Sequence, residues 1–373
     1  MTIMPKRSFP SPGGPEAQRC IQPLPAGILA GAKRAFTTRR VALDLAAGIE
    51  RNAAPRAGDV VLAEVETLGQ HRWLEDIHGR RVTLNEGDRI LVAYGDRYAP
   101  DQFEAHVPAT SGPCALVAGG GVAAEVLRRS ARVRDATRIL PLGILVDATG
   151  RRLNLRDFAM KPAPGGGLPS AAARVIAVVG SSMNAGKTTA ISAMVRGALR
   201  SGQKVAVIKV TGTGSGGDLW AQRDAGAGLA LDFTDAGHAS THRLTDAQRL
   251  EIFRTLLRRC RQEPGIGTIF VEVADGLLFG ESARLVLSGA FRGEVDALVL
   301  AAADAMGALY GEGWLIGHGL APLALTGAFT ASPIAADEVR AHARTPVLAH
   351  GELADGALAA DRHPGRPPMG RVA

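Results

Sequence analysis

The chain of 373 residues is long enough for two domains, and 46% hydrophobic with 21% charged residues is an ordinary globular balance. Aromatic residues make up only 4%, so we expect a core of Val, Ile, Leu and Ala, which suits buried parallel strands. The formal net charge of +7 is spread over single residues and short pairs such as Arg39-Arg40. A dedicated nucleic-acid surface favours longer basic runs, so we expect no nucleic-acid partner.

The sequence shows no sign of a secretory or membrane-spanning segment. Residues Met1 to Pro25 lack the apolar stretch of a signal peptide, and no apolar run is long enough to cross a bilayer. The cysteines Cys20, Cys114 and Cys260 are far apart and show no zinc-binding spacing. We therefore expect reduced thiols, a cytoplasmic protein and no membrane partner.

The first part of the chain predicts a flexible extension followed by a small β-rich domain. Residues 1–36 are rich in Pro, Gly and Arg, which is typical of a flexible extension. Residues 37–160 contain several short apolar runs bounded by turn residues, which predict an α+β domain with a small antiparallel sheet or barrel. The predicted elements are a short helix at Val41–Ala46, strands at Asp59–Val65 and Arg89–Gly95, and a hairpin formed by Arg72–Ile77 and Arg81–Leu84.

A glycine triplet, Gly119-Gly120-Gly121, follows an apolar run and precedes a helical pattern that extends to Leu127. A phosphate-binding turn is one interpretation. We favour a tight turn from a strand to a helix, because glycine-rich turns without a defined fingerprint are common.

The pattern changes after residues 161–173, a Pro- and Gly-rich stretch that predicts a linker. From 174 to 350, apolar strands alternate with amphipathic helices, which predicts an α/β domain with a mostly parallel sheet. Residues 351–373 are again rich in Pro, Arg and Gly and are predicted to be a flexible tail.

One motif decides the class of the α/β domain. An apolar strand, Val175–Val179, leads into a glycine-bearing loop that ends in Gly-Lys-Thr and opens a helix. This order predicts a P-loop, in which backbone N–H groups and the helix dipole bind phosphate. Lys187 is expected to reach the β- and γ-phosphates and the Thr188 hydroxyl to bind Mg²⁺. The predicted nucleotide-binding residues are Gly180, Ser181, Ser182, Met183, Asn184, Ala185, Gly186, Lys187, Thr188 and Thr189.

A second strand, Lys204–Val210, is expected to end beside the P-loop, because parallel strands joined by a right-handed crossover end at the same edge. Lys209 is the candidate to orient the acceptor or to clamp the transferred phosphoryl group. In the loop that follows, Thr211, Thr213 and Asp218 are candidate substrate-binding residues, and Asp218 is also a candidate Mg²⁺ ligand. A flexible surface loop is the alternative interpretation.

A third strand, Thr268–Val273, carries Glu272 near its end, where a carboxylate is placed to bind Mg²⁺ directly or through water. Asp275 is expected to bind the same ion or to accept a proton from the substrate. Further strands are predicted at Asp296–Leu300 and Leu323–Leu325, and the loop Thr326–Thr330 is expected to border the base. No Asn-Lys-x-Asp guanine signature is evident, so we favour ATP over GTP.

The polar segment Asp232–Arg243 contains His238 and His242, four residues apart. A metal site with this pair requires a helix and a third ligand. The sequence shows neither, so we favour a loop on the substrate side.

Residues 174–350 resemble the dethiobiotin synthetase branch of P-loop proteins. That branch includes the cobyrinic acid amidating synthetases and lies near the molybdopterin-guanine dinucleotide accessory protein. The shared features are the extended loop from Gly180 to Thr188, a lysine at the end of the second strand, Lys209, and the third-strand segment Val271–Leu278, which is similar to Val-Glu-Gly-Ala-Gly-Gly.

The sequence departs from that branch at several positions. Ser182 stands where the family usually has Asp, and Val210 replaces a proline, while Val273 and Asp275 replace glycines. The resemblance implies nucleotide and Mg²⁺ roles for the matching residues Lys187, Thr188 and Glu272, and it implies that Lys209 faces the substrate. It does not carry over the dethiobiotin substrate, and it leaves the β-rich domain uncovered. Because members of this branch often dimerise, a homodimer is a further expectation.

These observations predict an enzyme that uses ATP and Mg²⁺ to activate a small carboxylate or hydroxyl substrate by γ-phosphoryl transfer, as a kinase or ligase. A nucleotide-dependent switch or accessory protein that delivers a cofactor is the alternative from another class. An acyltransferase that uses the P-loop for a coenzyme A phosphate is a weaker third, because Thr188 and Glu272 suit Mg²⁺.

Overall fold

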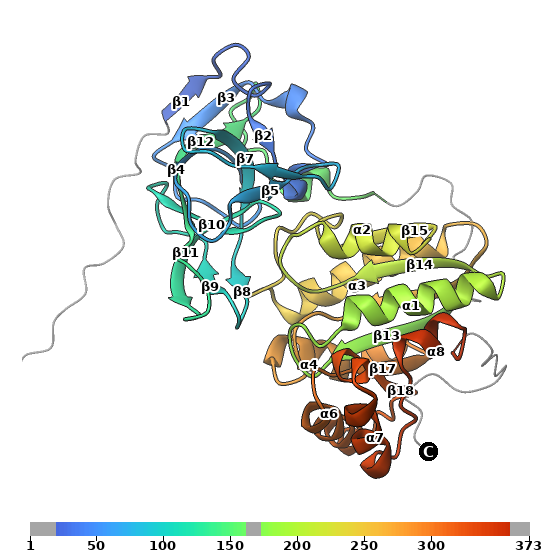
Figure 1. Cartoon of the computed structure of the whole chain (residues 1–373). Helices are drawn as coiled ribbons and strands as arrows, with labels where there is room; N and C mark the ends of the chain where they lie inside the picture. The colour runs from blue at the N-terminus through green and yellow to red at the C-terminus, as the bar shows by residue number, and fades with distance from the viewer. Residues whose placement is uncertain (1–19, 162–172, 359–373) are drawn as a thin grey trace, which may run out of the picture.

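The computed structural model describes residues 20–161 and 173–358, which form a β-rich domain and an α/β domain lying against each other (Figure 1). Apart from its two ends, the predicted linker lies outside the described residues, as do 1–19 and 359–373. The β-rich domain contains β1 (Cys20–Pro23), β2 (Lys33–Arg34), η1 (Phe36–Thr38), η2 (Leu43–Leu45), β3 (Gly48–Arg51), β4 (Val60–Thr67), β5 (Trp73–Glu75), β6 (Arg81–Thr83), β7 (Arg89–Tyr94), β8 (Arg97–Tyr98), β9 (Phe103–His106), β10 (Cys114–Ala118), β11 (Val122–Arg129), β12 (Thr137–Val146) and η3 (Leu155–Phe158).

Five strands of this domain pair in a closed ring, in the order β12, β4, β7, β11, β10 and back to β12. Two buried clusters flank the strands, one containing Val60, Leu62 and Leu91 and the other Val61 and Ile90. Because consecutive side chains of a strand point to opposite faces, this alternation places one cluster on each face. The pairings β2–β7 and β7–β11 are parallel, so the expected antiparallel sheet is in fact mixed.

Three predictions for this domain are wrong. Residues 20–36 are not a flexible extension, because β1 pairs with β3, β2 pairs with β7, and Phe36 is buried. Val41–Ala46 forms only the short 3-10 turn η2. The glycine triplet joins two antiparallel strands, β10 and β11, and no helix follows it, because pairing with neighbouring strands overrides the helix preference of Ala, Glu and Leu.

The α/β domain alternates strands and helices along the chain, as its sequence pattern predicts. Its strands are β13 (Arg174–Gly180), β14 (Lys204–Lys209), β15 (Leu229–Asp232), β16 (Ile266–Glu272), β17 (Ala297–Ala301) and β18 (Ala324–Thr326). Its helices are α1 (Lys187–Arg200), α2 (Gly217–Asp224), α3 (Asp246–Arg261), α4 (Gly280–Leu287), α5 (Gly289–Arg292), α6 (Ala305–Gly317), η4 (Ala328–Ala331), α7 (Pro333–His342) and α8 (His350–Ala354).

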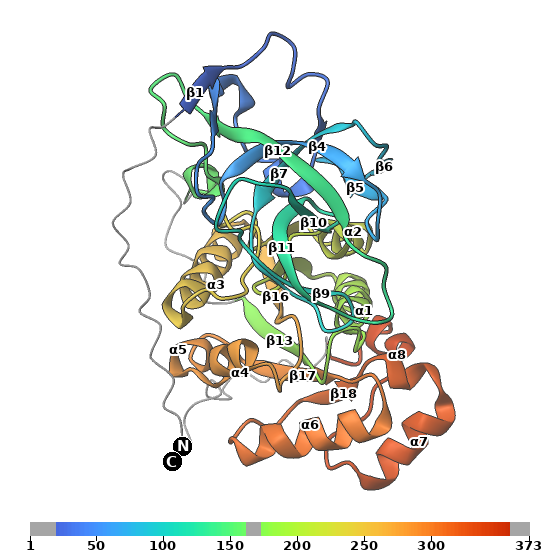
Figure 2. The same cartoon turned by 90° about the vertical axis from the view of Figure 1, so that its left-hand side faces the viewer.

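The six strands form one parallel sheet in the order β15, β14, β16, β13, β17, β18, which is compatible with a P-loop NTPase fold. On the central strand β13, Val175 and Ala177 pack in the cluster that contains α3, while Ile176 and Val178 pack in the cluster that contains α1. Figure 2 shows α3, α4 and α5 on one side of the sheet and α1 and α8 on the other. All strands therefore end at the same edge, which holds the P-loop.

The predicted end of this domain at residue 350 is also wrong. Helix α8 packs beside α1, and Leu353 and Leu358 are buried in the same cluster as Met194. The chain is therefore ordered by apolar contacts up to residue 358. In the described part of the chain, no helix combines the length and the apolar character needed to cross a membrane.

The β-rich domain contacts the α/β domain at the edge where the parallel strands end. Phe36 packs with Leu219 and Ala230 of the α/β domain, and Glu75 accepts hydrogen bonds from Ser215 Oγ and the backbone N–H of Gly216. A Cβ atom on Gly120 would lie 2.2 Å from the carbonyl oxygen of Gly214. The glycine triplet therefore allows the two backbones to approach each other closely.

Candidate active site at the domain interface

The P-loop connects the end of β13 at Gly180 with the start of α1 at Lys187. Its backbone turns through left-handed conformations at Asn184, where φ is 62°, and at Gly186, where φ is 91°. Asn and Gly are the residues that adopt this region most readily. The first turn of α1 therefore follows directly on a tight loop, which is the arrangement that binds anions through N–H groups.

Lys187 folds back across the start of its own loop. Its Nζ donates hydrogen bonds to the carbonyl oxygens of Ser182 and Asp275, both at 3.0 Å. A Cβ atom on Gly180 would lie only 2.7 Å from Nζ, so a larger residue there would displace the end of the lysine side chain. Burial lowers the pKa of Lys187, which is 6% exposed. Among the described residues no carboxylate forms an ion pair with it, so a bound phosphate would supply its counter-charge.

Three oxygen-bearing side chains meet beside the P-loop. The Thr188 hydroxyl donates to Asp218 Oδ1 at 3.0 Å and lies 3.3 and 3.4 Å from the two Glu272 carboxylate oxygens. Glu272 is 2% exposed, and burial raises its pKa. A hydroxyl and carboxylates are ligands that Mg²⁺ accepts. The structure thus brings together the three residues that the sequence proposes as metal ligands.

Lys209 forms ion pairs with both carboxylates of this group, Asp218 and, at 3.7 Å, Glu272. Burial opposes its charge, but these two carboxylates outweigh burial and raise the pKa of Lys209. Burial likewise opposes ionisation of Asp218, and Lys209 outweighs it so that the pKa of Asp218 is lowered. Lys209 therefore remains a cation next to the expected phosphate position.

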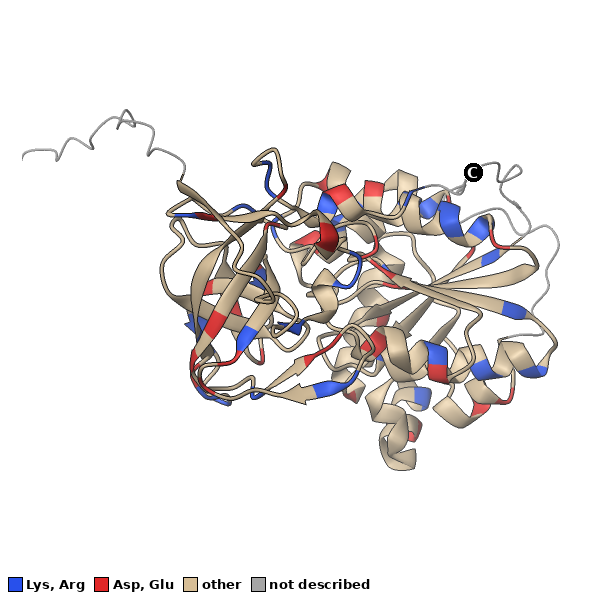
Figure 3. Ribbon diagram, turned by 90° about the horizontal axis from the view of Figure 1, so that it is seen from above, with Lys and Arg blue, Asp and Glu red and all other residues tan. Residues whose placement is uncertain are grey.

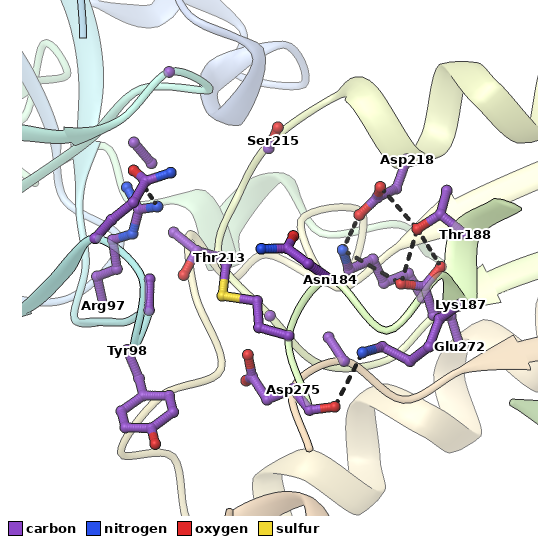
Figure 4. Close-up of a pocket in the computed structure, with 18 of the residues that line it drawn as sticks. Arg97, Tyr98, Asn184, Lys187, Thr188, Thr213, Ser215, Asp218, Glu272 and Asp275 are labelled. Carbon is purple, nitrogen blue, oxygen red and sulfur yellow. Dashed lines mark hydrogen bonds and ion pairs between the residues drawn. The ribbon is translucent and has the colours of Figure 1, made fainter. Parts of the chain in front are cut away.

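Asp275 faces the cavity from the loop after β16 (Figure 4). Its backbone adopts a φ of 65°, which is uncommon for Asp and is held by the bond from Lys187 to its carbonyl oxygen. Burial raises the pKa of its carboxyl group, although the nearby cations Lys187 and Lys209 oppose the shift. A carboxylate with a raised pKa is a suitable proton acceptor near neutral pH.

A cavity of about 730 Å³ joins these residues to the β-rich domain. Figure 4 shows the P-loop residues on one side and Arg97 and Tyr98 on the other. From the α/β domain it is lined by Met183, Asn184, Ala185, Gly186, Lys187, Thr188, Thr189, Lys209, Gly212, Thr213, Ser215, Asp218, Glu272, Ala274 and Asp275, and from the β-rich domain by Gln70, His71, Trp73, Glu75, Arg81, Arg97, Tyr98, Ala99, Gln102, Ala118 and Gly119.

Four residues that the sequence assigns to the site do not line the cavity. Gly180, Ser181 and Ser182 form the first part of the P-loop outside the cavity lining, and the N–H of Ser181 donates to the carbonyl oxygen of Ala301 on β17. Thr211 is 3% exposed, and its hydroxyl accepts a hydrogen bond from the Ala274 backbone at 2.8 Å. Its predicted substrate contact is therefore replaced by a bridge between the loops after β14 and β16.

Two other expectations concern loops near the site. The loop after β18 contacts the P-loop directly, since the Ala328 N–H donates to the Ala185 carbonyl oxygen at 3.0 Å. The segment with His238 and His242 consists of turns rather than a helix. Burial and the nearby Arg156 lower the pKa of His238 to about 4, and the two histidines do not form a metal-binding pair.

Arg97 is the main site residue that sequence reasoning misses. It is 6% exposed, and its Nε atom is buried without a hydrogen-bond partner. Its Nη2 donates to Gln102 at 3.0 Å, and its Nη1 lies 3.2 Å from Nε2 of His71. Burial lowers the pKa of Arg97 to about 10, and burial together with the Arg97 charge lowers that of His71 to about 4. The guanidinium is thus a buried cation beside a neutral ring.

Comparison with known proteins assigns no family, because no family model and no curated protein matches the chain. Among solved structures, a similar chain is the signal recognition particle 54 kDa protein from Aeropyrum pernix K1, in complex with GDP. The match has a TM-score of 0.28 and 16% identity, and it covers 53% of this chain and 41% of that chain. The dethiobiotin synthetase resemblance stays a prediction.

Replacement of Lys187 tests the P-loop. We expect Lys187→Ala to weaken binding of ATP with Mg²⁺ by roughly a hundredfold, because the change removes a buried charged donor to phosphate. Calorimetric titration measures the affinity, and Lys204→Ala, at an exposed lysine on β14, is the matched control. Affinity like that of the wild type in Lys187→Ala would contradict the assignment.

Glu272→Gln tests the metal ligands. The substitution keeps the size of the side chain and removes the charge that a hard cation requires. We expect nucleotide to remain bound while Mg²⁺-dependent ADP release falls by more than roughly tenfold, and Glu338→Gln, on an exposed face of α7, to change nothing. Turnover within about threefold of the wild type, too small for loss of a metal-site charge, would make Glu272 a structural residue.

Proposed function

We propose that this protein binds a nucleoside triphosphate with Mg²⁺ at the P-loop and transfers its γ-phosphoryl group to a small anionic substrate in the cavity between the two domains. The observation that carries this proposal is the composition of that cavity. It joins the P-loop lysine, three oxygen-bearing side chains that suit Mg²⁺ and a buried arginine from the other domain.

The nucleotide side of the proposal rests on the start of α1. A helix of 14 residues begins at Lys187, and its N-terminal N–H groups and dipole favour a phosphate there. Lys187 would exchange its two carbonyl acceptors for phosphate oxygens. Thr188, Asp218 and Glu272 would hold Mg²⁺ directly or through water, and the ion would neutralise charge that develops on the transferred group.

The substrate side rests on Arg97. A buried guanidinium without a carboxylate in direct contact is costly unless an anion enters beside it, and the more distant charges of Asp101 and Asp275 do not outweigh the effect of burial on the pKa of Arg97. No ion pair involving Arg97 occurs in the described part of the chain, and its Nε remains unpaired. A carboxylate or phosphate on the substrate would supply the missing charge, while Thr213 offers a hydroxyl in the same cavity. Arg97 would therefore select acidic substrates.

The accepting group is a hydroxyl or a second carboxylate. A hydroxyl requires a base, and Asp275 lies in the cavity with a raised pKa. A carboxylate requires none, because it is already ionised. Lys209 would stabilise negative charge on the transferred phosphoryl group in either case. We favour ATP over GTP because the guanine signature is missing from the sequence. We favour a small molecule over a nucleic acid because basic and acidic residues are interspersed over both domains (Figure 3).

One contact supports a nucleotide-dependent switch as the second candidate. Asn184 of the P-loop donates a hydrogen bond to Asp101 of the β-rich domain at 3.0 Å. A phosphate that moves the P-loop would alter this contact and change how the domains meet. An acyltransferase stays the weaker third candidate, since a coenzyme A phosphate needs no Mg²⁺ ligands.

A screen with pooled acidic metabolites tests the enzyme against the switch. The full chain is incubated with ATP, Mg²⁺ and each pool, and ADP release is measured. We expect stimulation by a small carboxylate- or phosphate-bearing compound. Arg97→Met should reduce the stimulated rate by roughly a hundredfold or more with little change in ATP affinity. Arg81→Met is the matched control, because Arg81 lines the same cavity but is exposed. Stimulation only by a protein partner would favour the switch.

The pH dependence of turnover tests Asp275. Burial raises its pKa, and a base acts only when it is ionised. Turnover with a hydroxyl substrate should therefore fall as the pH falls through this raised pKa. Asp275→Asn should lose this dependence and roughly two to four orders of magnitude in rate. Measurement of kcat against pH for both proteins decides it, and an unchanged rate in Asp275→Asn would indicate a carboxylate acceptor.

A further inference from the structure

A second cluster of polar side chains lies where the domains meet, outside the lining of the cavity. Glu104 and His106 come from β9 of the β-rich domain, and His242 comes from the turns before α3 of the α/β domain. Each offers one ligand atom, and these atoms all lie within 4.8 Å of one another. The proposed nucleotide chemistry uses none of the three residues.

The position of the first two ligands follows from the strand that carries them. Phe103 and Ala105 are buried, while Glu104 and His106 are only half-buried. Because alternate residues of a strand share a face, Glu104 and His106 project together toward His242. Strand β9 is fixed by its pairing with β11, and Arg128 on β11 donates to Oε2 of Glu104. This bond orients the carboxylate and leaves Oε1 available.

The imidazole of His242 is held with one nitrogen ready to bind a metal. Its Nδ1 lies 3.2 Å from Oε1 of Glu281. The other oxygen of Glu281, Oε2, accepts a hydrogen bond from Nη1 of Arg249 at 3.0 Å. A carboxylate beside Nδ1 favours the tautomer that carries its proton there. Nε2 then keeps a free electron pair, and this atom is buried without a hydrogen-bond partner. A carboxylate behind a histidine is the usual support of a metal ligand.

We propose that Glu104, His106 and His242 bind a divalent transition-metal ion of the zinc class. Two imidazoles and one carboxylate suit such an ion better than Mg²⁺, which prefers oxygen ligands. In a tetrahedral site with N and O ligands about 2.0–2.2 Å from zinc, the ligand atoms lie about 3.3–3.6 Å from one another. Side-chain rotations that bring the three atoms closer by up to about 1.5 Å therefore complete the site. Three protein ligands leave the fourth position open to water or substrate.

The ligands belong to both domains, so the ion would fasten the domain interface. Binding to the folded, closed arrangement stabilises it by mass action. Tyr98, whose ring centroid lies 5.6 Å from that of His242, also lines the substrate cavity. The metal would therefore hold in place a wall of the proposed active site without being part of the Mg²⁺ group.

Zinc binding by the full chain tests the proposal. The purified protein is stripped with EDTA, desalted, titrated with ZnSO₄ alone and desalted again. We expect about one equivalent of zinc to remain, as for one three-ligand site, and the melting temperature to rise. Co²⁺ in place of zinc should give the visible absorption of a four-coordinate ion. His106→Ala, His242→Ala and Glu104→Gln should each weaken zinc binding by at least about tenfold.

Matched variants separate this site from other zinc binding and from misfolding. His78→Ala, at an exposed histidine of the β5–β6 turn, His238→Ala and Asp218→Asn should bind zinc like the wild type. The melting temperature in EDTA and the affinity for ATP show whether His106→Ala and His242→Ala remain folded. No retained zinc in the wild type, or equal loss in His78→Ala and in the ligand variants, would overturn the proposal. Neither result affects the P-loop assignment, which the Lys187 experiment tests separately.

Discussion

Four charges, of which Lys187 and Glu272 are buried and Lys209 and Asp218 are half-buried, set the conditions for the site. Lys187, Lys209, Asp218 and Glu272 lie where β13, β14 and β16 end. Isolated charges are too costly to bury, and these four are retained because the lysines and carboxylates balance one another. The ion pairs of Lys209 satisfy both carboxylates, which leaves Lys187 bonded only to neutral carbonyl oxygens. Lys187 is therefore the cation of this group that gains most from a bound phosphate.

The β-rich domain adds another positive charge on the opposite side of the cavity. Arg97 is a further buried cation, and the interface around it is closed by contacts at Gly120 and Glu75. Phosphoryl transfer depends chiefly on positioning and charge stabilisation, and a cavity with fixed cations at both ends supplies both. The domain that the family resemblance leaves uncovered is thus the one that we expect to determine substrate choice.

The sequence predicts those site residues whose positions depend on neighbouring residues along the chain. The Gly-Lys-Thr motif placed Lys187 and Thr188 at the start of a helix, and the apolar run before Glu272 placed that carboxylate at the end of a parallel strand. These positions follow from the period of the pattern and from the topology of parallel sheets. The strands β13, β14, β16, β17 and β18 were predicted for the same reason.

The residues that were missed depend on contacts between distant segments. Nothing near Arg97 in the sequence shows that it faces the P-loop, since packing of the two domains creates that proximity. Residues 20–36 looked flexible by composition, yet pairing with β3 and β7 orders them. His242 was considered as a metal ligand only together with its sequence neighbour His238 and was rejected in favour of a substrate-side loop, whereas the fold places it beside His106 of the other domain. In each case the contacts that matter join residues that are far apart along the chain, and the sequence pattern does not show which residues meet.

The same packing couples the proposed metal site to the proposed active site. The Gly214 N–H donates to the Ala239 carbonyl oxygen at 2.8 Å, and the Thr241 N–H donates to that of Gly212 at 2.9 Å. These two bonds lie on either side of the antiparallel bridge between Thr213 and Ser240. Residues 212–214 and 239–241 therefore form a short ladder that ends just before His242. Packed segments and hydrogen bonds of this kind are one route by which two sites affect each other. A metal ion that fixes His242 would hold this ladder, and with it the loop that carries Thr213 toward the P-loop.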